Sequence, residues 1–182
     1  DGKKLIPCDA KSAREAKISY IPEDRHKYGI FLDIPFYETI SSEILKKISK
    51  VFLNKKQEKE ISKKYVDELK IKVLNDEQYS RMLSGGNQQK VVISKILTTE
   101  PKVVILDEPT NGVDSETIDI IYNILRDLNQ NKNISIIMVT HDIERVSKIS
   151  NRIFCFEEGN LMELNKEELE IELSHKHKHP HL

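Results

Sequence analysis

The stretch VVILDEPT, residues 103–110, decides the fold. Four apolar residues run from Val103 to Leu106, three of them β-branched, and Asp107 and Glu108 follow at once. An unbroken apolar run of this kind is typical of a strand that is buried on both faces of a parallel sheet. The two carboxylates would then stand at the carboxyl end of the strand, which is the edge where open α/β sheets bind ligands.

Three further apolar runs are predicted to be strands of the same sheet, because they are rich in β-branched or aromatic residues. They are residues 18–21, which Pro22 ends, residues 134–139 and residues 152–156. The segments between them show helical spacing, from Asn87 to about Thr98, over Ile118, Ile121, Leu125 and Leu128, and through Val146. This alternation predicts an α/β fold with a doubly wound parallel sheet.

A helical insert is predicted to precede the core, over residues of about 36–98. Apolar residues recur at helical spacing over residues 40–52 and again over 61–69, which indicates two amphipathic helices. A short helix is also expected over residues 8–17. The outer faces of the insert are rich in lysine, and a solvated helix face is a simpler explanation for them than a docking surface.

The sequence from Leu83 to Gly86 leads directly into the predicted helix at Asn87. The first N–H groups of a helix lack acceptors within it, and two glycines place no Cβ in the way of an anion, so phosphate binding is one interpretation. An ordinary helix capped by Ser84 is the other. The helix and the strand that ends at Asp107 match in length, so antiparallel packing would bring Ser84 to the same edge of the sheet.

Polar residues follow three of the predicted strands: Glu23, the Asp107-Glu108 pair, and His141. Each alone is weak evidence, because acidic residues after strands often cap helices and a lone histidine is usually structural. Together, at one edge of a sheet, they indicate a site. Asp107 could hold Mg²⁺ directly or through water, and Glu108 could orient and deprotonate an attacking water.

These segments together resemble the ATP-binding domain of ABC transporters. LSGGNQQK (residues 83–90) is similar to the signature motif, VVILDEPT to a Walker B motif with its catalytic glutamate, and residues 111–114 to the D-loop, while His141 stands at the switch position. YIPEDR (residues 20–25) resembles the Q-loop region of the monosaccharide importers, whose ATPase subunit carries two fused ABC domains. The chain resembles the second of these domains, up to about Glu163.

The resemblance implies a P-loop NTPase-like α/β fold with a helical subdomain, over about residues 36–98, inside a partial ABC domain of residues 1–163. The sequence holds no G-x-x-x-x-G-K-[ST] phosphate loop, so the resemblance also implies a domain truncated at its amino terminus. Residues 164–182 would form a carboxy-terminal helix and a histidine-rich tail. Disorder and weak metal binding are the two interpretations of that tail.

In this family two ABC domains meet head to tail, and each nucleotide lies between them. The signature residues would therefore contact ATP held by the partner domain, and the strand-end residues would serve ATP on this chain's own domain. The residues so implied are Glu108 and His141 as catalytic, Glu23, Ser84, Gly85, Gly86, Asn87 and Asp114 as ATP-binding, and Asp107 as the Mg²⁺ ligand. The resemblance further assigns Glu23 to coupling with the membrane subunit.

The function implied is ATP hydrolysis that drives import of a sugar, with ATP and Mg²⁺ as cofactors, at the cytoplasmic face of the cell membrane. The implied partners are a second ABC domain, fused or in trans, the permease subunits, and a periplasmic or lipid-anchored sugar-binding protein. Three alternatives stay open. They are a non-catalytic ABC domain that supplies its signature motif in trans, a nucleoside importer, and a soluble ABC ATPase.

The bulk composition narrows the possible classes. A net charge of -1, from 29 basic and 30 acidic residues, gives no global electrostatic case for nucleic acid as a partner. No apolar run approaches the roughly 20 residues of a membrane-spanning helix. Cys8 and Cys155 are isolated and show neither metal-site nor disulfide spacing, which favours a reducing compartment.

Overall fold

The computed structural model describes residues 9–48, 53–157, 159–165 and 167–171. The chain divides into two compact units, Asp1–Val139 and Thr140–Leu182, and each is described by itself. Within the described residues no helix is both long enough and apolar enough to cross a membrane.

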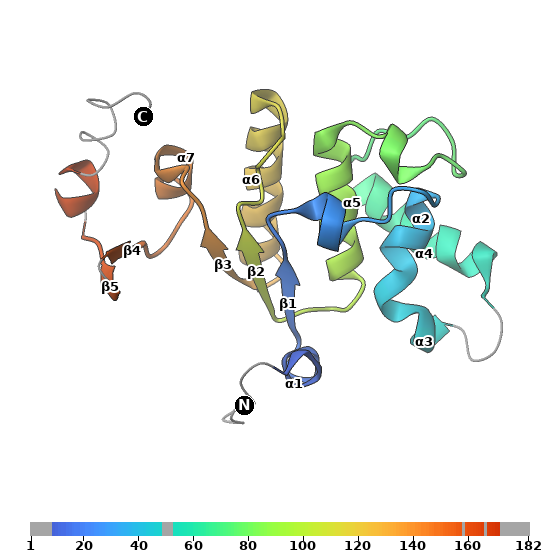
Figure 1. Cartoon of the computed structure of the whole chain (residues 1–182), viewed down its shortest axis with the longest axis horizontal. Helices are drawn as coiled ribbons and strands as arrows, with labels where there is room; N and C mark the ends of the chain where they lie inside the picture. Colours follow the sequence, from blue (N-terminus) through green and yellow to red (C-terminus); the bar gives the residue numbers. More distant parts are fainter. Residues whose placement is uncertain (1–8, 49–52, 158, 166, 172–182) are drawn as a thin grey trace. The chain divides into compact units, whose positions relative to one another are not determined.

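A parallel sheet of three strands forms the centre of the first unit (Figure 1). Its strands are β1 (Ile18–Ile21), β2 (Val103–Asp107) and β3 (Ser135–Val139), in the order β1-β2-β3. β2 is central, and its register pairs Ile21 with Leu106 on one side and Asp107 with Val139 on the other. The three strands predicted from apolar runs at these positions are confirmed, and their carboxyl ends share one edge.

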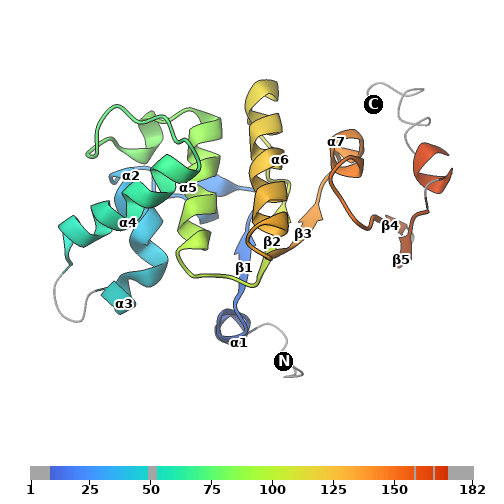
Figure 2. The same cartoon turned by 180° about the vertical axis from the view of Figure 1, so that it is seen from behind.

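Two long helices pack against this sheet. They are α5 (Gly85–Leu97), which contacts β1, and α6 (Ser115–Gln130), which contacts β3 and α5. α6 lies on the face of the sheet that is turned toward the viewer in Figure 2. Its apolar stripe is buried at Ile121, Leu125 and Leu128, as the helical spacing predicts. Both helices begin at the edge where β2 ends, because the turn after β2 leads into α6 and α5 runs antiparallel to the strand.

Burial of β3 differs from the prediction of strands covered on both faces. One face of β2 is buried, at Val104 and Leu106, and its other face is half-buried. In β3, Ile137 and Val139 are 55% and 57% exposed. These two side chains share one face of the strand, because successive residues of a strand alternate between its faces. Packing within the described residues therefore half-buries one face of β3 and leaves Ile137 and Val139 on the other face exposed.

The helical region lies beyond α5 on the side away from β2 and β3 (Figure 1). The first predicted helix starts earlier than expected and is irregular, as α2 (Phe36–Ser41), a 3₁₀ turn (Ser42–Ile44) and α3 (Leu45–Ile48); residues 49–52 lie outside the described range. The second is α4 (Lys55–Glu68), capped by Asn54. α2 packs on both α4 and α5, so the insert is attached to the core through α5. The short amino-terminal helix is α1 (Ala10–Glu15), capped by Asp9.

The second unit contains α7 (Ile143–Ser147) and a hairpin of β4 (Phe154–Glu157) and β5 (Asn160–Glu163). The prediction that residues 152–156 join the parallel sheet is wrong, because β4 pairs antiparallel with β5, with Glu157 opposite Asn160. Gly159, at a φ of +82°, supplies the positive φ that a tight hairpin turn requires. Residues 167–171 are helical, and the histidine-rich segment lies outside the described residues.

Candidate functional site

The carboxylate of Asp107 is held at the end of β2 by the neighbouring strand. The hydroxyl of Tyr20, on β1, donates a hydrogen bond of 2.9 Å to Oδ2 of Asp107. Burial and the adjacent Asp107 carboxylate both raise the pKa of Tyr20, so the phenol stays protonated and remains the donor. Sequence reasoning missed Tyr20, because its partner is a strand neighbour 87 residues away.

The backbone turns sharply at Glu108. Its N–H donates to the carbonyl of Val139 at 2.9 Å, which extends the β2–β3 ladder by one bond beyond Asp107. Its φ is +39°, in the left-handed region that a residue with a Cβ rarely adopts. Asn111 N–H then donates to the Glu108 carbonyl at 3.1 Å and closes a turn. The positive φ therefore belongs to the turn by which the chain leaves β2.

Ser84 caps α5, which confirms the interpretation of the LSGG segment as the start of a capped helix. The Ser84 hydroxyl oxygen accepts from Asn87 Nδ2 at 3.0 Å and lies 3.5 Å from the Asn87 backbone nitrogen. Asn87 Oδ1 also accepts from the backbone N–H of Lys72 at 3.0 Å. The side chain of Asn87 therefore ties the start of α5 to the loop after α4. Gly85 and Gly86 follow the cap, in the first turn, where backbone N–H groups have no acceptor within the helix.

Both glycines are required by close packing. A Cβ on Gly85 would lie 2.6 Å from the carbonyl oxygen of Gly112, and one on Gly86 would lie 2.2 Å from Cγ2 of Thr117. The start of α5 is thus pressed against the turn after β2 and against the first turn of α6. This confirms the predicted geometry, in which the LSGG segment and the DEPT turn share one edge.

Arg25 joins the segment after β1 to the same turn. It belongs to η1 (Arg25–Gly29), a π-helical turn. The carboxylate of Asp24 caps this turn by accepting hydrogen bonds from the backbone N–H groups of His26 and Lys27. The guanidinium of Arg25 donates to the carbonyl of Asn111 at 2.5 Å and to that of Gly112 at 3.2 Å. Asn111 Nδ2 in turn donates to Oε1 of Glu23 at 3.1 Å. Arg25 is 9% exposed, and its burial lowers the pKa of the guanidinium, an effect that Asp24 opposes.

Asp114 has a local structural role. Its carboxylate caps α6 by accepting the N–H of Thr117 at 2.9 Å. Hydrogen bonding from Thr117, through its side chain first and its backbone second, lowers the pKa of Asp114. Contact of Asp114 with ATP stays a prediction.

His141 lies in the second unit, two residues beyond the end of β3. It is exposed and directly precedes Asp142, whose carboxylate accepts the N–H of Arg145 at 3.2 Å and caps α7. Its contact with a γ-phosphate stays a prediction.

Asp107, the last residue of β2, is the carboxylate at this edge that is predicted to hold a metal. No group of three or more histidine, cysteine, aspartate or glutamate side chains that could hold a metal occurs among the described residues. This donor set fits Mg²⁺, which keeps most of its waters and is commonly bound by one or two carboxylates together with substrate phosphates.

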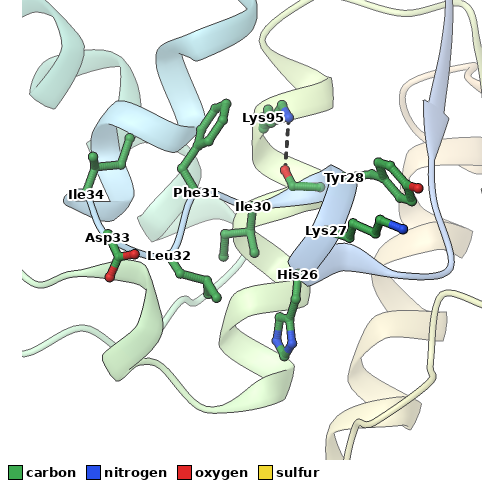
Figure 3. Close-up of a pocket in the computed structure, with 10 residues that line it drawn as sticks. His26, Lys27, Tyr28, Ile30, Phe31, Leu32, Asp33, Ile34 and Lys95 are labelled. Atoms are coloured by element: carbon green, nitrogen blue, oxygen red, sulfur yellow. Dashed lines mark hydrogen bonds between the residues drawn. The ribbon is translucent and has the colours of Figure 1, made fainter.

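Two pockets flank the segment that follows Glu23, and neither includes the strand-end carboxylates. One, of about 410 Å³, is lined by residues 26–34 and Lys95 (Figure 3); the other, of about 420 Å³, reaches Tyr20, Pro22 and Glu43. Lys95 lines both. Its ammonium group donates to the carbonyl of Gly29 at 2.9 Å, the dashed line in Figure 3, and lies 3.7 Å from a Glu43 carboxylate oxygen.

In comparison with known proteins, the chain matches one family model and relatives with a shared role. A family model described as "ABC transporter" matches residues 1–111. The chain is 37% identical over 169 residues to the xylose import ATP-binding protein of Moorella thermoacetica and 39% identical over 170 residues to the ribose import ATP-binding protein of Oceanobacillus iheyensis. Each alignment includes 92% of this chain, which spans about a third of the relative's length, 33% and 34% respectively.

Solved structures share the fold. The CbiO1 protein of Clostridium perfringens, part of an ABC transporter complex, superposes with a TM-score of 0.72 and 25% identity, over 93% of this chain and 66% of that one. A dimeric ATP-binding cassette in a post-hydrolysis state, bound to ADP and Pi, gives a TM-score of 0.68 and 22% identity, over 86% and 68%. The predicted P-loop NTPase-like α/β fold is confirmed.

Proposed function

This chain belongs to the ABC transporter family, and from that premise we propose that it is an ATP-binding portion of a subunit that drives uptake of a monosaccharide. Two observations support a sugar as the transported substrate. The relatives are named as xylose and ribose import ATP-binding proteins, and the similarity to them extends over 92% of this chain. The observation that carries the ATP-dependent role is the packing of the LSGG start of α5 against the turn that follows Asp107 and Glu108.

The first proposed role is to complete an ATP site on a second ABC domain. Ser84, Gly85, Gly86 and Asn87 would contact the γ-phosphate of ATP held by that domain. The first N–H groups of α5 point out of the helix and carry the positive end of its dipole, so they suit an anionic group. The two glycines let the start of α5 approach the turn after β2 and the first turn of α6 closely.

The second proposed role is to serve ATP bound to this chain's own domain. Asp107, held by Tyr20, would hold Mg²⁺, and Glu108 would orient and deprotonate the attacking water. His141 would contact the γ-phosphate, and Glu23 would couple the site to the membrane subunit. Asp114 would orient the D-loop from its position as the cap of α6. Bound Mg²⁺ neutralises charge that develops on the phosphates, and the side chains supply position and proton transfer.

The proposed partners are a second ABC domain, permease subunits and a sugar-binding protein outside the membrane. The proposed location is the cytoplasmic face of the cell membrane. These follow from the names of the relatives as import ATP-binding proteins.

The chain tested as printed, residues 1–182, is expected to show no appreciable Mg²⁺-dependent ATP hydrolysis. Its sequence contains no G-x-x-x-x-G-K-[ST] loop to hold the β- and γ-phosphates, so the strand-end carboxylates have no substrate positioned against them. Phosphate release by the purified chain is the measurement. A turnover that Glu108→Gln abolishes would show that the chain holds ATP by another route, and would contradict this expectation.

The proposed function is tested with the whole subunit and its permease in proteoliposomes. Uptake of labelled ribose or xylose should require ATP, and addition of the sugar and its binding protein should stimulate ATP hydrolysis. Uptake of a nucleoside instead would assign the complex to nucleoside import. ATP hydrolysis that neither the permease nor any solute alters would contradict an import role and favour a soluble ABC ATPase.

A further inference from the structure

Arg25 is the contact through which three separate parts of the site meet. It stands at the start of η1, two residues after Glu23. Its guanidinium donates hydrogen bonds to two successive backbone carbonyls, those of Asn111 and Gly112. The third part is the start of α5. A Cβ on Gly85 would lie 2.6 Å from the Gly112 carbonyl oxygen and 3.1 Å from Nη2 of Arg25. The arginine therefore fills the space where the turn after β2 meets the LSGG segment.

We propose that Arg25 is a positioning residue that holds the Asn111–Gly112 backbone against the start of α5, so that both face the partner domain's nucleotide as one rigid surface. The inference rests on the proposed function, because it concerns the same composite site. Arg25 itself touches no reacting atom and acts through the backbone of the D-loop and of α5.

The charge of Arg25 explains why an arginine suits this place. Carbonyl oxygens carry partial negative charge, and that of Gly112 lies beside the helix start that is proposed to receive a γ-phosphate. A guanidinium satisfies both carbonyls at once and offsets their repulsion of the anion. A lysine would keep the charge but lacks the planar fork that fixes two acceptors in one orientation.

The other contacts of η1 make the arrangement a link between the Glu23 segment and α5. His26 Nε2 lies 2.8 Å from Gln88 Oε1, and the Gly29 carbonyl accepts from Lys95 Nζ at 2.9 Å. A Cβ on Gly29 would lie 3.3 Å from Cγ2 of Val92, so η1 also packs closely on the middle of α5. η1 is thus fixed along α5 by side chains one to two turns apart, while Arg25 reaches across to Asn111 and Gly112. A displacement at Glu23 would reach the D-loop through Arg25 and through the Glu23–Asn111 hydrogen bond.

The test uses the whole subunit assembled with its permease, and compares Arg25→Lys and Arg25→Gln with Arg126→Gln. Arg126 is an exposed arginine on α6 whose guanidinium donates to Asn123 of the same helix, so it controls for loss of one positive charge. Both Arg25 variants are expected to lower kcat for sugar-stimulated ATP hydrolysis about 10- to 100-fold, because misplacement of about 1 Å has effects of that size. KM for ATP should change less than about threefold, since Arg25 does not contact bound ATP.

A chemical rescue separates positioning from general stabilisation. Millimolar methylguanidinium should restore several-fold of the lost kcat in Arg25→Ala, and methylammonium should not, because only the guanidinium can bridge two carbonyls. Amide hydrogen exchange should rise at residues 84–88 and 110–114 in Arg25→Lys and stay unchanged at β1. If the glutamine variant does not assemble, the lysine variant carries the test.

The proposal is overturned if Arg25→Lys has the kcat of Arg126→Gln, or if kcat falls without any rescue by methylguanidinium and without the local rise in exchange. If the proposed function is wrong, these experiments give a different result. The unaltered complex would then hydrolyse no ATP in response to sugar, whereas the exchange comparison would still report whether Arg25 holds residues 110–114.

Discussion

Gly85→Ala in the whole subunit is expected to lower sugar-stimulated ATP hydrolysis by about 10²-fold or more, since displacement of a positioned group by about 1 Å is enough for such a loss. The added Cβ would lie 2.6 Å from the backbone carbonyl oxygen of Gly112. A backbone oxygen cannot rotate away, so either α5 or the turn after β2 must shift. Steady-state phosphate release with the permease present is the measurement.

Gly86→Ala provides the matched comparison, because its clash is with a side chain. Its Cβ would lie 2.2 Å from Cγ2 of Thr117, 3.1 Å from Oγ1 and 2.9 Å from Cβ. Thr117→Ala removes the first and second of these atoms. Overpacking of this kind costs about 1–3 kcal/mol. We expect the double variant Gly86→Ala/Thr117→Ala to regain part of the stability that Gly86→Ala loses in denaturant unfolding, because the Thr117 Cβ remains 2.9 Å away.

The same second change should not help Gly85→Ala, whose obstacle is main chain. Equal rescue of both variants by Thr117→Ala would mean that α5 slides as a rigid rod along α6, and would contradict the packing of Gly85 on Gly112. Full activity of Gly85→Ala would contradict the proposed contact between this glycine and a partner's ATP.

The sequence predicts most of the sheet because periodicity is a local property. The apolar runs before Pro22 and before Asp107 each specify a strand without reference to distant residues, and Ser84 before two glycines specifies a capped helix start. Length matching then places that helix start at the edge where Asp107 stands. The structure confirms this placement, through contacts between Gly85 and Gly112 and between Gly86 and Thr117.

Arg25 could not be predicted in the same way. Its partners are backbone carbonyls 86 and 87 residues away, and every residue of the chain carries such a carbonyl. Nothing in the type of Asn111 or Gly112 marks them as acceptors for an arginine. The only local signal is a cation placed four residues after the end of a strand, and that pattern equally describes a solvated loop.

The prediction for residues 152–156, which form β4 of the hairpin, is wrong for another reason. Residues 152–156 form an apolar run like those of the parallel strands, and such a run does not state which partner it pairs with. Gly159 is the local signal for the hairpin, since a glycine that follows a strand and precedes Asn160 and Leu161 is compatible with a tight turn between antiparallel strands. Partner choice among strands depends on turn geometry, which the periodicity of a single strand does not contain.

Glu108→Gln in the whole subunit is expected to lower steady-state ATP hydrolysis by about 10²-fold or more, the usual contribution of a positioned general base. Glutamine has nearly the same shape and can keep the backbone at its φ of +39°, but its amide cannot take a proton from water. ATP binding should therefore persist while turnover stops. Phosphate release and retention of labelled ATP, measured on the same preparation, separate the two steps.

Glu100→Gln is the control that the chain itself offers. Glu100 is an exposed glutamate with a φ of +53°, in the turn before β2, so it matches Glu108 in residue type and backbone conformation at the opposite end of the strand. Its replacement should leave turnover unchanged. If Glu108→Gln also leaves turnover unchanged while Gly85→Ala abolishes it, this domain contributes only its signature helix to the partner's ATP, and the non-catalytic alternative is correct. Loss of turnover in Glu108→Gln assigns hydrolysis to this domain's own carboxylate as well.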